Sequence, residues 1–220
     1  MDLKCLVHRY TLIASFILFF PVAFPSNGWC HEVVGEVTPL MVQTKNTLTL
    51  IDNGRNEQAL TIAWKIYEDF QSPMRQGTEA GLKTSSARID KTFGTKLKSS
   101  LNSSIKRKNY QELQKELRLL SFFLMLEKFN VLEKTFGKKN ANLSAQRTIF
   151  WLGRNYFSYL LEPTMGKLDP IEEKRLDRLL DKMLYSLEDG EWNTFKSLRK
   201  ELENGTIHFF KFPVFGHTFN

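Results

Sequence analysis

The sequence predicts an all-α protein, an up-down antiparallel bundle of helices. Apolar residues recur every three or four positions over most of residues 57–204, the spacing that places them on one face of a helix. Glycine and proline fall between these periodic segments, as expected at helix ends. Both cysteines of the 220-residue chain, Cys5 and Cys30, lie in its first 30 residues. The rest of the chain therefore has no internal disulfide and must be stabilised by helix packing.

The first 30 residues have the layout of a secretory signal. Lys4 and Arg9 precede an apolar run at 11–24, and a polar, turn-forming stretch follows it. The run is shorter than the roughly 20 residues of a membrane-spanning helix. We therefore expect a signal segment at 1–30, a periplasmic or secreted protein, and membrane contact only through this segment. Two alternatives stay open, a retained anchor and a lipoprotein acylated at Cys30, although the tryptophan before Cys30 is bulky for a lipoprotein signal.

The first helical unit, residues 31–137, is expected to contain three helices. The segment 31–52 could open a further helix or remain extended. Asn56 is suited to cap the first of the three, and Pro73 should end it. The third is apolar on every side over 119–126, which is typical of a central helix in a bundle. The predicted helices span 57–72, 86–104 and 110–136.

The second helical unit, residues 138–206, follows a polar break at 137–142. Asp169, followed by proline and then by two acidic residues, is a strong start signal for its middle helix. An Asp-Gly pair should end that helix, and Asn204 with Gly205 should end the last one. The predicted helices span 144–161, 170–188 and 192–204.

The two units resemble each other when the chain is shifted by 87 residues. The TIAW of 61–64 then meets the TIFW of 148–151, and the RID of 88–90 meets the RLD of 175–177. This pattern favours two related helical hairpins. Because the matches are few, chance similarity is the alternative.

Small, aromatic and acidic residues follow one another in a characteristic order along the first two predicted helices: Ala59, Ala63, Tyr67, Asp69 and Phe70, then Phe93. In this order they resemble the extracytoplasmic helical domain of bacterial members of the high-affinity iron permease family. The chain departs from that family at Gln71, where the family has a glutamate. It also lacks the permease's membrane helices and its Arg-Glu-x-x-Glu iron motif.

The resemblance implies a stand-alone accessory of iron or other metal-ion uptake. The ligand would be iron or another divalent cation, and the partner a membrane permease or another envelope protein. The candidate metal ligands are the carboxylates of Glu68, Asp69, Glu173 and Asp177. Glu173 and Asp177 are four positions apart and share a helix face. The alternative is a solvated face on which neighbouring lysine and arginine side chains pair with these acids.

The C-terminal tail, residues 207–220, is rich in phenylalanine. It is expected to be either an extended strap that lies on the bundle or a peptide that binds a partner. The candidate partner-binding residues are Phe209, Phe210, Phe212 and Phe215.

Composition and motifs favour a binding protein over an enzyme. The sequence contains no Gly-x-Ser-x-Gly, no His-Glu-x-x-His and no glycine-rich phosphate loop, so we expect no enzymatic activity. The formal net charge is +7, but the cations are interleaved with acids and the protein is expected to be exported, so we expect no nucleic-acid partner. The sequence thus predicts an exported helical binding or accessory module linked to metal-ion uptake. The alternative is a non-catalytic structural or protein-interaction scaffold of the cell envelope.

Overall fold

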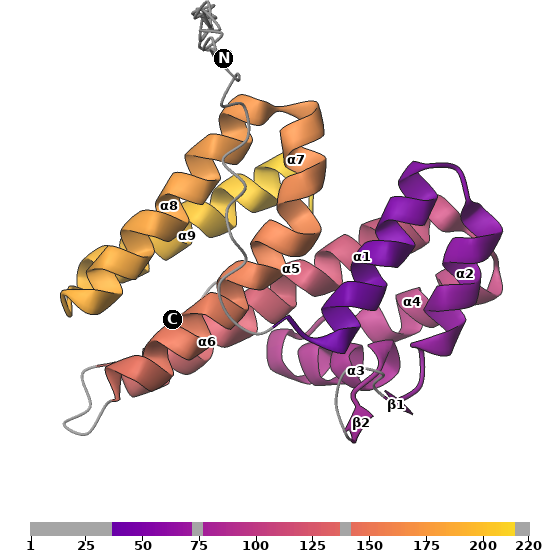
Figure 1. Cartoon of the computed structure of the whole chain (residues 1–220), viewed down its shortest axis with the longest axis horizontal. Helices are drawn as coiled ribbons and strands as arrows, with labels where there is room; N and C mark the ends of the chain where they lie inside the picture. The colour runs from indigo at the N-terminus through magenta and orange to yellow at the C-terminus, as the bar shows by residue number, and fades with distance from the viewer. Residues whose placement is uncertain (1–36, 72–76, 137–141, 214–220) are drawn as a thin grey trace, which may run out of the picture. The chain divides into compact units, whose positions relative to one another are not determined.

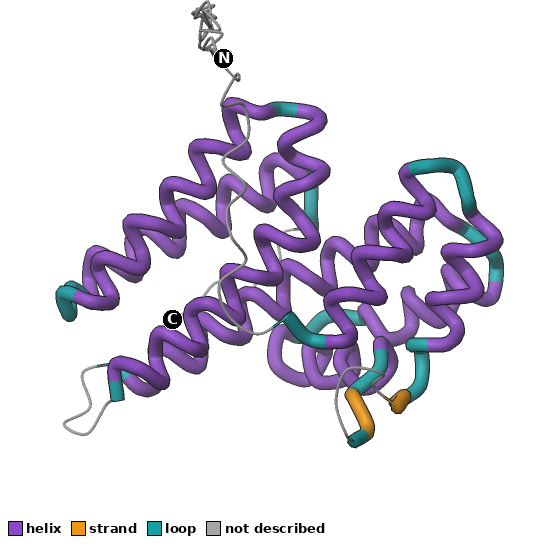
Figure 2. The backbone as a smooth tube through the Cα atoms, in the orientation of Figure 1, coloured by secondary structure: helices purple, strands orange, loops and turns teal. Residues whose placement is uncertain are grey.

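The computed structural model describes residues 37–71, 77–136 and 142–213. These described residues belong to one compact unit. The described residues are almost entirely helical (Figures 1 and 2), which confirms the all-α prediction. The predicted signal segment at 1–30 and Phe215 lie outside the described residues. None of the described helices is both long enough and apolar enough to cross a membrane.

The first half of the chain forms helices and one small hairpin: α1 (Pro39–Asp52), α2 (Asn56–Lys65), β1 (Phe70–Gln71), β2 (Thr78–Glu79), α3 (Leu82–Phe93), α4 (Leu97–Lys106) and α5 (Tyr110–Thr135). The sequence left open whether the segment 31–52 forms a helix or stays extended, and the structure has helix α1 in this segment. The Thr38 hydroxyl caps it by accepting a hydrogen bond from the Met41 N–H at 3.2 Å, and Pro39 occupies the first turn, where a missing N–H costs nothing.

Helix α2 is shorter than the predicted helix at 57–72, because tertiary contacts hold the chain in a turn instead. The Asp69 carboxylate accepts a hydrogen bond from the Gly81 N–H at 2.9 Å, and β1 pairs with β2 beside it. Gly81 packs so closely on the backbone of Glu68 that a Cβ would lie 2.1 Å from the Glu68 carbonyl oxygen. These contacts of Gly81 with Asp69 and Glu68, and not the proline at position 73, determine where α2 ends.

The predicted helix at 86–104 is two helices, α3 and α4. Gly94 ends α3 with a left-handed φ of 68°, a conformation that glycine adopts without strain. The Asp90 carboxylate, still in α3, accepts hydrogen bonds from the backbone N–H groups of Leu97 at 2.7 Å and Lys98 at 3.1 Å. It therefore caps the start of α4 in place of a residue from α4's own N-terminus.

Helix α5 confirms the predicted central helix. It begins where the Asn109 side chain accepts a hydrogen bond from the Glu112 N–H, and every residue from 119 to 126 is buried. It packs against α1, α3, α4 and α6, and α6 runs alongside it in Figure 1. A helix that is covered on all sides has to be apolar all round, as the sequence indicated.

The second half contains α6 (Leu143–Tyr156), a π-helical turn η1 (Phe157–Leu161), α7 (Glu162–Leu168), α8 (Pro170–Glu188) and α9 (Trp192–Phe210). The helix predicted at 144–161 therefore continues to Leu168. A proline inside a helix normally interrupts it, but near Pro163 a wide turn bonds the Glu162 N–H to the Phe157 carbonyl, five residues earlier, and so makes room for the proline ring. The predicted cap of α8 is confirmed, since Asp169 accepts hydrogen bonds from the Ile171 and Glu172 N–H groups.

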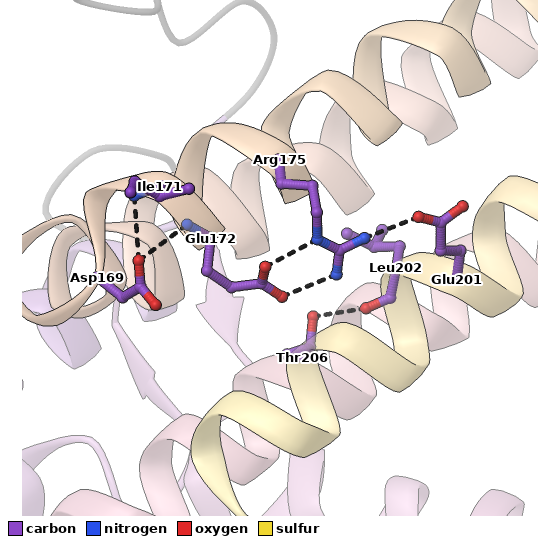
Figure 3. A network of polar contacts seen from close by, with 7 residues as sticks. All are labelled: Asp169, Ile171, Glu172, Arg175, Glu201, Leu202 and Thr206. Carbon is purple, nitrogen blue, oxygen red and sulfur yellow. Dashed lines mark hydrogen bonds and ion pairs between the residues drawn. The ribbon is translucent and has the colours of Figure 1, made fainter.

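Helices α8 and α9 pack against each other, and a polar network joins them (Figure 3). Arg175 of α8 makes a two-pronged ion pair with Glu172, with both N–O distances 2.7 Å, and a third bond of 2.7 Å to Glu201 of α9. Gly205, predicted to end the last helix, lies inside α9. Its Cβ position is 2.6 Å from both the Arg175 Nη2 and the Leu176 Cδ2, so this glycine serves close helix packing and the helix continues to Phe210.

The boundary predicted between the two units lies outside the described residues, at 137–141. The helices on its two sides, α5 and α6, pack against each other, so both predicted units share one compact body. Helices α2 and α6 begin 87 residues apart, at 56 and 143, which matches the predicted shift. The duplication itself stays a prediction.

Candidate functional site

The two predicted metal ligands of the first half already have other partners. The exposed Glu68 carboxylate pairs with Lys83 at 2.8 Å. Asp69 holds the turn after α2 through the Gly81 N–H, and this hydrogen bond is the main cause that lowers the pKa of its carboxyl. Both acids thus have structural roles that explain their place in the sequence.

The two predicted ligands of the second half lie in a cluster of charges between α6, α7 and α8. Asp177 pairs with Arg154 of α6 at 2.8 Å, and both side chains are 6% exposed. Arg154 also reaches Asp181 at 2.7 Å. Glu173 forms a hydrogen bond with Glu162, and burial, followed by this bond, raises the pKa of Glu162 to about 8. Burial against Glu173 therefore favours the neutral form of the Glu162 carboxyl.

These acids do not assemble a metal centre with those of the first half. Across residues 37–71, 77–136 and 142–213, no three histidine, cysteine, aspartate or glutamate side chains form a group that could hold a metal ion. The metal site stays a prediction of the sequence.

The predicted partner-binding phenylalanines begin a row of aromatic rings. We call residues 207–213 the aromatic segment. Phe209 packs edge-on against Phe210, with ring centroids 4.8 Å apart, and Phe210 stacks on Phe212 at 5.2 Å. Phe212 contacts Phe122 of α5 at 5.5 Å, and from there the row continues through Phe123 to α3. The segment is therefore anchored in the core.

The described part of the tail is not the extended strap that the sequence allowed, and partner binding by the tail stays a prediction. Residues up to Phe210 are helical, and Lys211 then ends α9 with a left-handed φ of 52°. Phe212 is 5% exposed, whereas Phe209 and Phe210 are half-buried and His208 is exposed. We call the buried Phe212 the inner part of the segment and the partly accessible Phe209 and Phe210 its outer part.

A pocket of about 290 Å³ lies beside the inner part. It is lined by Gly94, Thr95, Lys96, Leu97, Ser100, Glu116, Leu119 and Pro213. Glu116 is 7% exposed, and burial, together with a hydrogen bond to Glu112, raises the pKa of its carboxyl to about 7. Sequence reasoning missed this residue, although a signal exists: Glu116 lies three positions after Leu113 and four before Leu120, on the apolar face of α5.

A larger and more open pocket, of about 810 Å³, lies at the turns α1–α2 and α4–α5. Its carboxylate, Asp52, accepts a hydrogen bond from Gln114 and pairs with Arg118 at 3.3 Å. Tyr110, also in the lining, donates to Glu57 at 2.7 Å. The acidic and phenolic groups here are thus engaged with protein partners.

The fold and these sites define an all-α helical protein with a buried carboxyl and an aromatic segment at its C-terminal helix. No family model, curated protein or solved structure that was compared with the chain matches it. The resemblance to the iron permease domain therefore stays a prediction.

Proposed function

We propose that this protein is a non-catalytic interaction module that binds a protein partner through the outer part of the aromatic segment. The observation that carries the proposal is the half-buried pair Phe209 and Phe210, at the end of a ring row anchored through Phe212 in the core. Aromatic side chains are prominent among the residues that dominate binding energy at interfaces. Because the rings are held in place before binding, little conformational entropy is lost on association.

The charges around the rings indicate the chemistry of the partner surface. Lys211 is exposed beside them, as is the imidazole of His208, and the whole chain is cationic at +7. An interface with an apolar centre and a polar rim is the usual arrangement. A partner with an apolar depression rimmed by acidic groups would be complementary, and the opposite charges would speed association.

The cellular setting is part of the proposal and rests on sequence. The segment 1–30 supports export to the periplasm or beyond, and the resemblance supports a membrane permease or another envelope protein as the partner. In such a setting the module would serve metal-ion uptake by contact with the partner. Within the part of the chain that the structure describes, the arrangement of the carboxylates gives no support for metal binding by this protein itself.

The test starts with a photo-crosslinking amino acid at position 209 in cells, and at the exposed Tyr185 of α8 as the control position. A protein captured only from position 209 is then purified and titrated against the unmodified chain and a variant with Phe209→Ala and Phe210→Ala. We expect the variant to raise Kd at least tenfold, since loss of one hot-spot contact costs about 2 kcal/mol.

Two further variants separate binding from folding. Tyr185→Ala removes an aromatic ring that is 63% exposed elsewhere and should leave Kd unchanged. Lys211→Glu should slow association and weaken its dependence on salt while leaving the melting temperature unchanged. Equal affinity of the double variant and the unmodified chain would refute the proposal.

A further inference from the structure

Glu116 lies where the aromatic segment meets the rest of the fold. Its carboxyl is on α5 and lines the 290 Å³ pocket. The opposite walls are the turn between α3 and α4 and Pro213, the last described residue of the aromatic segment. Pro213 follows directly on Phe212, whose backbone N–H donates to the Ile207 carbonyl at 3.1 Å. Pro213 therefore links one wall of this pocket to the aromatic segment.

The charged groups around Glu116 come from three sources. Helix α5 itself contributes Glu112, which bonds to the Glu116 carboxyl, and Lys115. Helix α3 contributes Asp90, and the turn after it contributes Lys96, an exposed side chain in the pocket lining. The pocket-lining residues of α4 and of the aromatic segment are uncharged. The two acids, Glu112 and Asp90, disfavour a further negative charge at this place, whereas Lys115 favours it.

We propose that Glu116 is a pH-sensitive latch: its neutral form lets Pro213 stay packed at the pocket, and its ionised form admits water and loosens the aromatic segment. This inference rests on the proposed function, because the segment that it releases is the proposed contact with the partner.

The pKa of the Glu116 carboxyl lies in the pH range over which the latch is proposed to respond. Burial is the largest cause that raises its pKa, the hydrogen bond to Glu112 is the next, and together they bring it to about 7. In an open, hydrated pocket the pKa would return toward the ordinary value of about 4.3 for a glutamate. The closed state therefore binds the proton more tightly than the open state, and it loses stability relative to the open state as the pH rises through 7.

Loosening would change what the aromatic segment offers to a partner. In the closed state Phe212 is buried against Phe122, and only Phe209 and Phe210 are partly accessible. Release at high pH would add the Phe212 ring to the accessible surface. Partner capture is then expected to increase as the pH rises from 6 to 8.

The experiment measures hydrogen exchange of the Phe212 amide in the full chain between pH 5.5 and 8.5, expressed as a protection factor that removes the intrinsic pH dependence of exchange. We expect protection to fall about tenfold as the pH rises toward the closed-state pKa of about 7 and to level off above it, because a tenfold fall corresponds to a pKa that is one unit lower in the open state. Glu116→Gln keeps the size and polarity of the side chain and should abolish the fall. Glu112→Gln removes the neighbouring acid and should move the fall to lower pH.

Two control variants isolate the latch from other titrating groups. Glu203 of α9 is equally buried at 7%, and its pKa is also raised by burial, but its charged neighbours are Arg199, Glu133 and Lys200. Glu203→Gln should therefore retain the fall in protection. His208→Gln should retain it as well, because this imidazole is exposed and is not among the residues of the pocket.

Three results would overturn the inference: protection of Phe212 that does not change with pH, an unchanged fall in Glu116→Gln, or a fall that disappears in His208→Gln. Because exchange is measured on the free protein, these results are independent of whether a partner binds. Failure of the latch and failure of the proposed function are thus distinguishable.

Discussion

The ion pair between Arg154 and Asp177 should be the most sensitive charged contact of the fold. The two side chains are 6% exposed and joined at 2.8 Å, and they tie α6 to α8. Substituting Asp177 by leucine leaves a buried guanidinium without this partner. Loss of one member of a buried pair costs about 3–5 kcal/mol. The half-exposed Asp181, at 2.7 Å from Arg154, keeps part of the compensation, so we expect a loss of about 2–4 kcal/mol in the free energy of unfolding.

Removing both members of the ion pair at once gives a complementary test. Replacing Arg154 by methionine together with Asp177 by leucine removes both buried charges, and such exchanges are often close to neutral. Asp181 is 41% exposed and can be hydrated when its partner is lost. We expect the double variant to lie within about 1 kcal/mol of the unmodified protein, which makes the two single substitutions strongly non-additive.

Urea unfolding at pH 7, followed by circular dichroism and extrapolated linearly, measures all four proteins of this cycle. A loss of about 3 kcal/mol would also lower the melting temperature by about 6–12 °C in a protein of this size. Additive single substitutions, or a cost below about 1 kcal/mol for Asp177→Leu, would refute the reasoning, because either result means that the pair is hydrated in solution.

Three further predictions concern packing, capping and pH. Gly205→Ala places a Cβ 2.6 Å from the ends of the Arg175 and Leu176 side chains. It should lower the free energy of unfolding in urea by about 1–2 kcal/mol, since the cost of overpacking exceeds the gain in helix propensity. A stabilised variant would contradict the close packing of α8 on α9. Asp169→Ala removes the acceptor for two N–H groups of α8 and should cost about 1–2 kcal/mol, whereas Asp169→Asn should cost less. The pKa of Glu116 is raised to about 7 in the folded state, so its contribution to stability is full below about pH 4.3 and is lost as the pH rises through 7. Glu116→Gln should reduce the loss of unfolding free energy between pH 5 and 8 by about 1–2 kcal/mol, after allowance for solvent screening in the open pocket, and equal losses in both proteins would contradict this assignment.

The helices that local signals could predict are those whose ends depend on neighbours in sequence. Helix α8 begins at an aspartate cap followed by Pro170, and both lie within its own first turn. Helix α5 is apolar over 119–126 because it is covered on every side. In these cases the information that decides the structure lies within a few residues of the place where it acts.

The ends that the sequence missed depend on distant partners. Helix α2 stops early because Asp69 is bonded to Gly81, twelve residues further on. Helices α3 and α4 separate because Asp90 caps α4 across the turn. Gly205 resembles a helix stop in the sequence, but it serves the contact with α8. A glycine that ends a helix and a glycine that allows two helices to pack closely look the same in a sequence, and only the packed structure distinguishes them.

The candidate metal ligands show the same limit of sequence-based prediction, because their partners are also distant in sequence. Glu173 and Asp177 share a helix face in the sequence pattern, and the adjacent cations Lys174 and Arg178 are local candidates to neutralise them. The structure gives Asp177 a partner that no local pattern indicates, Arg154, which is 23 residues away on α6. Since an Asp177 substitution weakens the fold with or without a metal, a loss of metal binding in such a variant would not identify a ligand. The Arg154→Met and Asp177→Leu double variant removes the carboxylate while the fold is kept. Metal retained by that protein would exclude Asp177 from coordination, and metal lost from it would be the first direct support for the predicted site.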